Sequence, residues 1–234
     1  MKTVVYGATR NLYRNLLPCI NSVLRNGNVD EIVLMIENDT FPYRLPKRVR
    51  TINVSGQKWF SEKSPNYYCR WTYMVLMKLA VSKLFPDYDK VLVLDCDTIV
   101  EGDLSPLWKL DMSDYYYAAV PQTRETYPTP YDKEGEDFIY INAGSLFCNL
   151  DKLRRDGKDD ELIEAVNTRA FTWVEQDCIS ELCQGGIRPL PGRYNRSDYT
   201  LHDSVYIVRH FAANKQWRHN AIVQLYDAEE VIYD

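Results

Sequence analysis

The stretch Lys90–Val100, KVLVLDCDTIV, decides the fold. Its apolar part, Val91 to Leu94, is a continuous run of branched residues, which is typical of a strand buried on both faces of a parallel sheet. Asp95 and Asp97 follow where that strand should leave the sheet. In open α/β sheets, ligands bind in the crevice beyond the carboxyl ends of the strands, so this position predicts a functional site.

The rest of the chain supplies the other elements of an α/β fold. Short apolar runs predict strands at 3–6, 31–36, 49–54, 90–94, 115–120, 138–150 and 205–208, the last leading to His210. Apolar residues at helical spacing predict helices at 12–26, 73–84, 160–166 and 175–183. We expect the first helix to become regular only near Pro18, and the strand at 138–150 to be broken at Asn142-Ala143-Gly144.

Composition limits the kind of protein. The chain has 234 residues, 45% hydrophobic residues and a net charge of -5, which fits one globular domain and gives no basic excess for nucleic acid. Six cysteines without a CxxC pair predict reduced thiols in the cytoplasm. No signal peptide and no transmembrane segment is expected, while a peripheral membrane contact and a homo-oligomer stay open.

The two aspartates and a distant histidine are candidate metal ligands. Alternation along an extended backbone would point Asp95 and Asp97 to one face, and two carboxylates at a crevice suit a cation that also binds phosphate. A solvated turn is the competing interpretation. His210 follows an apolar pair, and an Asp/Asp/His set suits Mn²⁺, with Mg²⁺ as the alternative. Lys215 follows five residues later. Its ammonium would lie over a phosphate of the ligand, or it would be an ordinary solvated surface lysine.

Several motifs in a fixed order carry a family resemblance. They are VVYGATRNLY, YYCRW, KVLVLDCDTIVEGDLSPLW, YINAGSLFCNL, EQDCIS and HFAANKQW, which span about residues 3–217. In this order the chain resembles the retaining glycosyltransferases of family 8. The resemblance implies a GT-A fold, a Rossmann-like α/β domain with a mixed, mainly parallel central sheet. It also implies one domain over 1–234, with donor-binding residues in about 1–100 and the acceptor side in about 101–234.

The resemblance also implies a UDP-sugar donor, either UDP-glucose or UDP-galactose, and a Mn²⁺ cofactor. Asp95, Asp97 and His210 would bind the metal. The donor would contact Ala8, Thr9, Tyr13 or Leu12, Arg70, Asp95, Cys96, Asn142, Ala143, Gly144 and Lys215. Gln176 and Asp177 would be catalytic. The acceptor, a glycan, lipid or protein, is not readable from the sequence, and neither is self-glycosylation.

Three positions depart from the family pattern. Ala213 and Gln216 replace a glycine and a proline in the end motif, whose His-to-Lys gap is one residue shorter. Glu175 replaces the first carboxylate of D-Q-D, and the aromatic residue expected on uracil is displaced to Tyr13 or lost at Leu12.

The reaction itself requires charge stabilisation on the leaving diphosphate, which a divalent cation and a lysine supply. Because glutamine is a poor nucleophile, we expect front-face substitution, with Gln176 or Asp177 stabilising charge or positioning the acceptor. Two other functions stay open: a sugar-nucleotide-binding protein without turnover, and a metal-dependent nucleotidyltransferase. The nucleotidyltransferase is less favoured because the loop Gly7–Arg10 holds a single glycine instead of a glycine-rich phosphate loop.

Overall fold

The computed structural model describes residues 1–234 except 123–130, 132–136, 201–202, 213, 215 and 233–234. The strands are β1 (Thr3–Gly7), β2 (Glu31–Ile36), β3 (Val49–Asn53), β4 (Lys90–Leu94), β5 (Thr98–Val100), β6 (Tyr117–Pro121), β7 (Ile141–Asn149), β8 (Ile187–Pro189) and β9 (Val208–His210). The α-helices are α1 (Tyr13–Asn26), α2 (Val81–Leu84), α3 (Leu150–Arg155), α4 (Lys158–Thr168), α5 (Val174–Leu182) and α6 (Ala221–Gln224).

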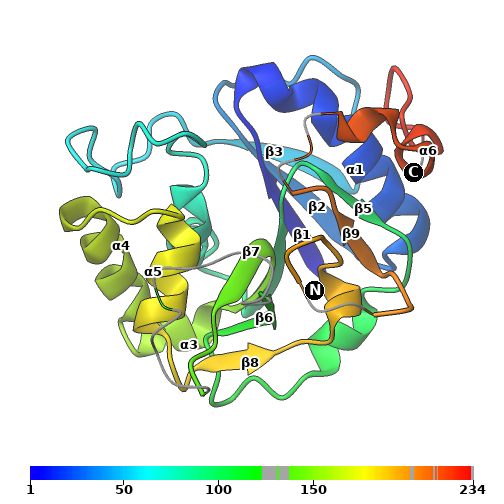
Figure 1. The fold of residues 1–234 in the computed structure, drawn as a ribbon. Coiled ribbons are helices and arrows are strands. Elements are labelled where there is room, and N and C mark those ends of the chain that lie inside the picture. Colours follow the sequence, from blue (N-terminus) through cyan, green and yellow to red (C-terminus); the bar gives the residue numbers. More distant parts are fainter. Residues whose placement is uncertain (123–130, 132–136, 201–202, 213, 215, 233–234) are drawn as a thin grey trace.

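Seven of these strands form one sheet in the order β3-β2-β1-β4-β7-β6-β8 (Figure 1). Strands β1 to β4 pair in parallel, whereas β7 runs antiparallel to both of its neighbours, β4 and β6. Strands β5 and β9 form a separate antiparallel pair. The expected mixed, mainly parallel central sheet is therefore confirmed.

The sheet is covered on both faces, and side-chain alternation explains how. In β4, Val91 and Val93 belong to one apolar cluster, while Leu92 and Leu94 belong to another. The first cluster packs against α3, α4 and α5, and the second packs against α1 and the β5–β9 pair (Figure 1). Because both faces are buried, the inner parallel strands β1, β2 and β4 carry apolar runs, as the sequence predicted for β4. The edge strand β3 is only partly buried and includes Arg50, Thr51 and Asn53.

Some predicted boundaries were wrong. Helix α1 begins at Tyr13, after a 3₁₀ turn over Arg10–Leu12. It continues through Pro18, in its second turn, at the cost of one intrahelical hydrogen bond. The helix expected at 73–84 is a 3₁₀ turn over Leu76–Leu79 followed by the single turn α2. The last strand lies at Val208–His210 instead of 205–208.

The direction of β7 positions the site. Since β7 is antiparallel to β4, its first residues lie at the sheet edge where β4 and β1 end. Leu94 pairs with Ser145, and the Asp95 amide donates to the Gly144 carbonyl at 3.0 Å. The segment 142–144 thus lies next to Asp95. Strand β7 is continuous through it, but the register between β6 and β7 shifts across residues 141–146, so the expected irregularity is present on the β6 side.

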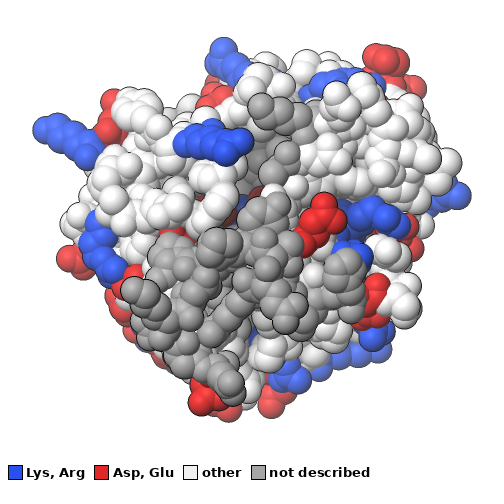
Figure 2. Space-filling view, in the orientation of Figure 1, with Lys and Arg blue, Asp and Glu red and all other residues white. Residues whose placement is uncertain are grey.

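Charged side chains of both signs are interspersed on the face shown in Figure 2, in keeping with the net charge of -5. No helix among the described residues is long and apolar enough to cross a membrane.

Candidate active site

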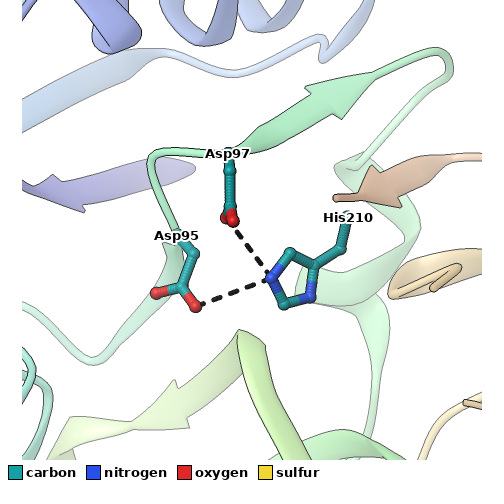
Figure 3. Close-up of side chains that lie close together, drawn as sticks. All are labelled: Asp95, Asp97 and His210. Atoms are coloured by element: carbon teal, nitrogen blue, oxygen red, sulfur yellow. Dashed lines mark ion pairs between the residues drawn. The ribbon is translucent and has the colours of Figure 1, made fainter. Parts of the chain in front are cut away.

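Asp95, Asp97 and His210 lie together at the carboxyl edge of the sheet (Figure 3). His210 Nε2 is 3.3 Å from Asp97 Oδ1 and 3.8 Å from Asp95 Oδ2. One ligand atom from each of the three residues falls within 4.8 Å of the other two. Two carboxylates and an imidazole at this spacing are donors that suit Mn²⁺ or a similar divalent cation, so the residues fit the expected metal.

Strand pairing brings His210 next to Asp97, although the two residues are more than a hundred positions apart in the sequence. Thr98 of β5 pairs with His210 of β9, and the Phe211 amide donates to the Asp97 carbonyl at 3.0 Å. The backbone that follows Asp97 is therefore fixed to the backbone that follows His210. The sequence gives no sign of β5, because three residues are too short for a periodic pattern.

His210 and Asp97 stabilise each other's charged forms. Burial lowers the pKa of His210, but Asp97 outweighs that effect and the net pKa is raised. Burial likewise raises the pKa of Asp97, yet His210 outweighs it and the net pKa is lowered. The positive imidazolium of His210 and the negative carboxylate of Asp97 thus balance each other. A divalent cation bound here would supply the positive charge in place of the imidazolium.

Lys78 is a site residue that the sequence prediction missed. Its side chain is 6% exposed, and Nζ lies 2.6 Å from Asp95 Oδ1 and 2.9 Å from Glu175 Oε1. Nζ also donates to the Ala143 carbonyl at 3.0 Å. Burial lowers the pKa of Lys78, but the two carboxylates outweigh it and raise the pKa, so the ammonium stays charged. A lysine that directly follows the apolar run Tyr73–Met77 (YMVLM) is the signal that could have identified it.

Glu175 is the second buried carboxylate of this network. Burial is the largest effect on its pKa and Asp95 adds to it, so the pKa is raised although Lys78 opposes the shift. The replacement of the family's aspartate by glutamate therefore still delivers a carboxylate to the buried lysine.

Arg70, a predicted donor contact, is exposed in the loop before the 3₁₀ turn over Leu76–Leu79. Its guanidinium carbon lies 5.7 Å from the centre of the Trp71 ring. The Trp71 ring in turn lies 5.3 Å from that of Trp173, just before α5.

Gly144 makes room for the metal-site histidine. A Cβ atom added at Gly144 would lie 2.1 Å from His210 Cε1 and 2.3 Å from Nδ1. Only a residue without a side chain permits this contact. The glycine expected to mark a bulge or a ligand approach therefore marks the approach of the imidazole ring.

Gln176 and Asp177 differ in their surroundings. Gln176 Oε1 accepts from the Ala143 amide at 3.0 Å, and Nε2 donates to Gln122 and to the Tyr140 hydroxyl. Asp177 is 1% exposed, and both of its oxygens are occupied. One accepts from the Tyr140 hydroxyl at 2.6 Å, and the other accepts from the amides that precede α5, at Thr172 and Trp173.

The predicted nucleotide residues lie at the end of β1. Ala8 is buried, and its amide donates to the Met35 carbonyl at 3.1 Å. The Tyr13 ring is buried against Phe41, with 5.2 Å between ring centroids, and its hydroxyl accepts from the Glu37 amide. Thr9 Oγ1 donates to Asn11 at 2.6 Å. Leu12 packs against the apolar cluster that contains Tyr13 and other residues of α1.

Cys96 lies between the two aspartates and is partly exposed, and burial raises the pKa of its thiol. All six cysteines are free. Lys215 and Ala213 lie outside the described residues. A polar pocket of about 230 Å³ borders His210 and is lined by Arg196, Ser197, Asp198, Tyr206, Arg209, His210, Phe211, Ala212, Asn214 and Asn220.

Comparison with known proteins agrees with this arrangement. Residues 3–221 match the family description Glycosyl transferase family 8. A Haemophilus influenzae protein with a provisional glycosyltransferase name is 28% identical over 140 residues, covering 57% of this chain and 41% of the relative. Glycosyltransferase GlyD of Streptococcus pneumoniae is 29% identical over 172 residues, covering 70% of this chain and 19% of GlyD. The chain thus spans less than half the length of either relative.

Among solved structures, the galactosyltransferase LgtC in complex with donor and acceptor sugar analogues superposes with a TM-score of 0.67. The match covers 91% of this chain and 87% of LgtC at 20% identity. The shared fold is the expected GT-A-like α/β arrangement.

Proposed function

Because the chain belongs to glycosyl transferase family 8, we propose that it transfers glucose or galactose from a UDP-sugar to an acceptor with retention of anomeric configuration. The observation that carries this proposal is the convergence of Asp95, Asp97 and His210 where β4 ends. Ligands of open α/β sheets bind at this edge, and a diphosphate needs a cation there.

Mn²⁺ is the proposed cofactor, since imidazole among the ligands favours it over Mg²⁺. Asp95, Asp97 and His210 would hold it. When bound, the cation supplies electrostatic stabilisation of the negative charge that grows on the departing UDP diphosphate. Lys78 holds the Asp95 carboxylate in place through the contact of 2.6 Å between Nζ and Oδ1.

The donor sugar is proposed to lie over the segment Asn142–Gly144, beside Gln176. The Ala143 amide holds the Gln176 carboxamide in one orientation, so that the side chain is ready to position the sugar or the acceptor. Asp177 is buried and accepts three hydrogen bonds, which supports front-face substitution over a covalent intermediate on this residue.

The remaining donor contacts are proposals of the same kind. The backbone at Ala8 and Thr9, with Tyr13, would meet the uridine, and Cys96 would line the ribose. Lys215 would hold the diphosphate. Arg70 would contact the donor, and Lys78, whose ammonium lies against Asp95, is a further candidate near the sugar.

The test begins with binding and proceeds to turnover. We expect UDP with Mn²⁺ to raise the melting temperature and UDP-glucose or UDP-galactose to release UDP. Asp97→Asn should abolish the Mn²⁺-dependent part of the shift with the fold intact. Absence of both binding and UDP release would refute the proposal.

Other outcomes select other functions. Binding without UDP release across a panel of acceptors would identify a sugar-nucleotide-binding protein. Pyrophosphate release from UTP and a sugar phosphate would identify a nucleotidyltransferase. A sugar covalently attached to Asp177, detected by mass spectrometry, would contradict front-face substitution.

A further inference from the structure

Asn195 lies behind His210 and connects it to the segment that starts β7. The residue is fully buried, and its Oδ1 is 3.0 Å from His210 Nδ1. Its Nδ2 donates to the Asn142 carbonyl at 3.1 Å and to Asn142 Oδ1 at 2.8 Å. No role was expected for Asn195 from the sequence.

The chemistry of the neighbours fixes the orientation of the Asn195 amide. The Asn142 carbonyl can only accept a hydrogen bond, so the group that faces it must be the NH₂. Asn142 Oδ1 is itself identified as oxygen, because the Gly144 amide donates to it at 3.1 Å. A flipped Asn195 would place its oxygen against two acceptors. Therefore Oδ1 faces His210.

This orientation decides which imidazole nitrogen carries the proton. Asn195 Oδ1 only accepts, so His210 Nδ1 must donate to it. The other nitrogen, Nε2, is the one that lies 3.3 Å from Asp97. In the neutral ring Nε2 then carries the lone pair, on the side where the aspartates converge.

We propose that Asn195 is a positioning residue that holds His210 as the Nδ1–H tautomer, with Nε2 directed to the cation site of Asp95 and Asp97. The role of the cation rests on the proposed function. Outer hydrogen bonds of this kind orient metal-binding histidines and set which nitrogen is available. Through the same amide, the position of the imidazole is tied to Asn142, at the proposed donor-sugar segment.

The side chain of Asn195 is not required to hold its own loop. The Asn195 amide donates to the Gly192 carbonyl at 3.1 Å, and the Thr200 hydroxyl donates to the Asn195 carbonyl at 2.6 Å. The next residue, Arg196, bonds to β9 through its backbone in both directions, to Val208 and His210. The backbone at Asn195 is therefore held by its own hydrogen bonds, and the buried carboxamide bonds to His210 and Asn142.

A first experiment needs no variant of Asn195. Two-bond ¹H–¹⁵N correlation spectra of ¹⁵N-histidine-labelled, metal-free protein, recorded at a pH high enough for a neutral imidazole, should show His210 protonated at Nδ1 and bare at Nε2. His210→Ala assigns the signal, since the chain has three histidines. In Asn195→Leu we expect the Nε2–H tautomer to appear. A wild-type ring protonated at Nε2, or an unchanged tautomer in Asn195→Leu, would overturn the proposal.

A second experiment measures Mn²⁺ affinity from the electron paramagnetic resonance signal of the free ion. Asn195→Leu should bind Mn²⁺ about 10-fold to 100-fold more weakly. The matched control is Asn149→Leu, another buried asparagine with hydrogen bonds to backbone, located at the far end of β7. It should bind Mn²⁺ like the wild type.

A double-mutant cycle separates an effect through His210 from a general one. If Asn195 acts through the imidazole, Asn195→Leu should cause little further loss in a His210→Ala background. Full additivity of the two losses would contradict the proposal. If wild-type protein fails to bind Mn²⁺, the proposed cofactor fails, while the tautomer measurement still decides the role of Asn195.

Discussion

Lys78 and Asp95 form a buried ion pair, with 2.6 Å between Nζ and Oδ1, and the same ammonium lies 2.9 Å from Glu175. One cation thus holds two carboxylates of the site, one on the loop after β4 and one on α5. This pairing lets two acidic side chains approach each other in a region where either charge alone would be costly.

Removal of this cation should destabilise the protein. In Lys78→Met, Asp95 and Glu175 lose their partner, and breaking a buried pair costs roughly 3 kcal/mol, the low end of the range because Asp95 keeps some solvent contact. Urea unfolding would measure the loss. Arg155→Met, which removes solvent-accessible pairs with Asp151 and Asp156, is the control and should cost less than about 1 kcal/mol. Equal stabilities of the two variants would contradict the role of Lys78.

Gly144→Ala should displace the His210 ring, because the new Cβ would lie 2.1 Å from Cε1. We expect Mn²⁺ affinity to fall at least about 10-fold, comparable to the loss of a ligand-orienting contact. Isothermal titration calorimetry would detect this. Gly56→Ala, where a Cβ meets nothing within 4 Å, should leave the affinity unchanged. Normal Mn²⁺ binding by Gly144→Ala would show that the ring tolerates the methyl group.

Asp177→Asn tests whether this carboxylate is structural. An amide cannot accept all three hydrogen bonds, so either the buried Tyr140 hydroxyl or the amides of Thr172 and Trp173 lose an acceptor, at a cost of about 1–3 kcal/mol if the buried hydroxyl is the one affected. Thermal and urea unfolding would reveal the loss. If Asp177→Asn kept its stability but lost UDP release almost completely, a direct chemical role would be favoured instead.

Gln176→Ala should lower activity strongly and stability little, the opposite of Asp177→Asn. The side chain is partly exposed at the site, and loss of one preorganised donor typically lowers kcat about 100-fold. Stability should change much less than in Asp177→Asn. The control Gln184→Ala, just beyond α5, should retain kcat. A change in donor KM alone would assign Gln176 to ground-state binding.

Sequence patterns identified the long elements and the ligands of the proposed cation. The inner parallel strands were readable because burial on both faces gives them long apolar runs, and Asp95 and Asp97 stand out directly after such a run. His210 was found because it follows the apolar end of the last strand. Short elements escaped: β5 and β8 have three residues each, which is less than any period requires.

The sequence alone thus determined the sheet, the acidic loop at its edge and the kind of ligand that the loop suits, because these follow from local polarity and spacing. Tertiary structure alone decided which side chains surround the two aspartates and the histidine. Lys78 and Glu175 reach Asp95 because the 3₁₀ turn over Leu76–Leu79 packs against α5 beside the sheet. Asn195 meets its partners because the antiparallel course of β7 and the β5–β9 pairing bring Asn142 and His210 to the same edge. Their roles depend on contact geometry and burial, which no local pattern encodes.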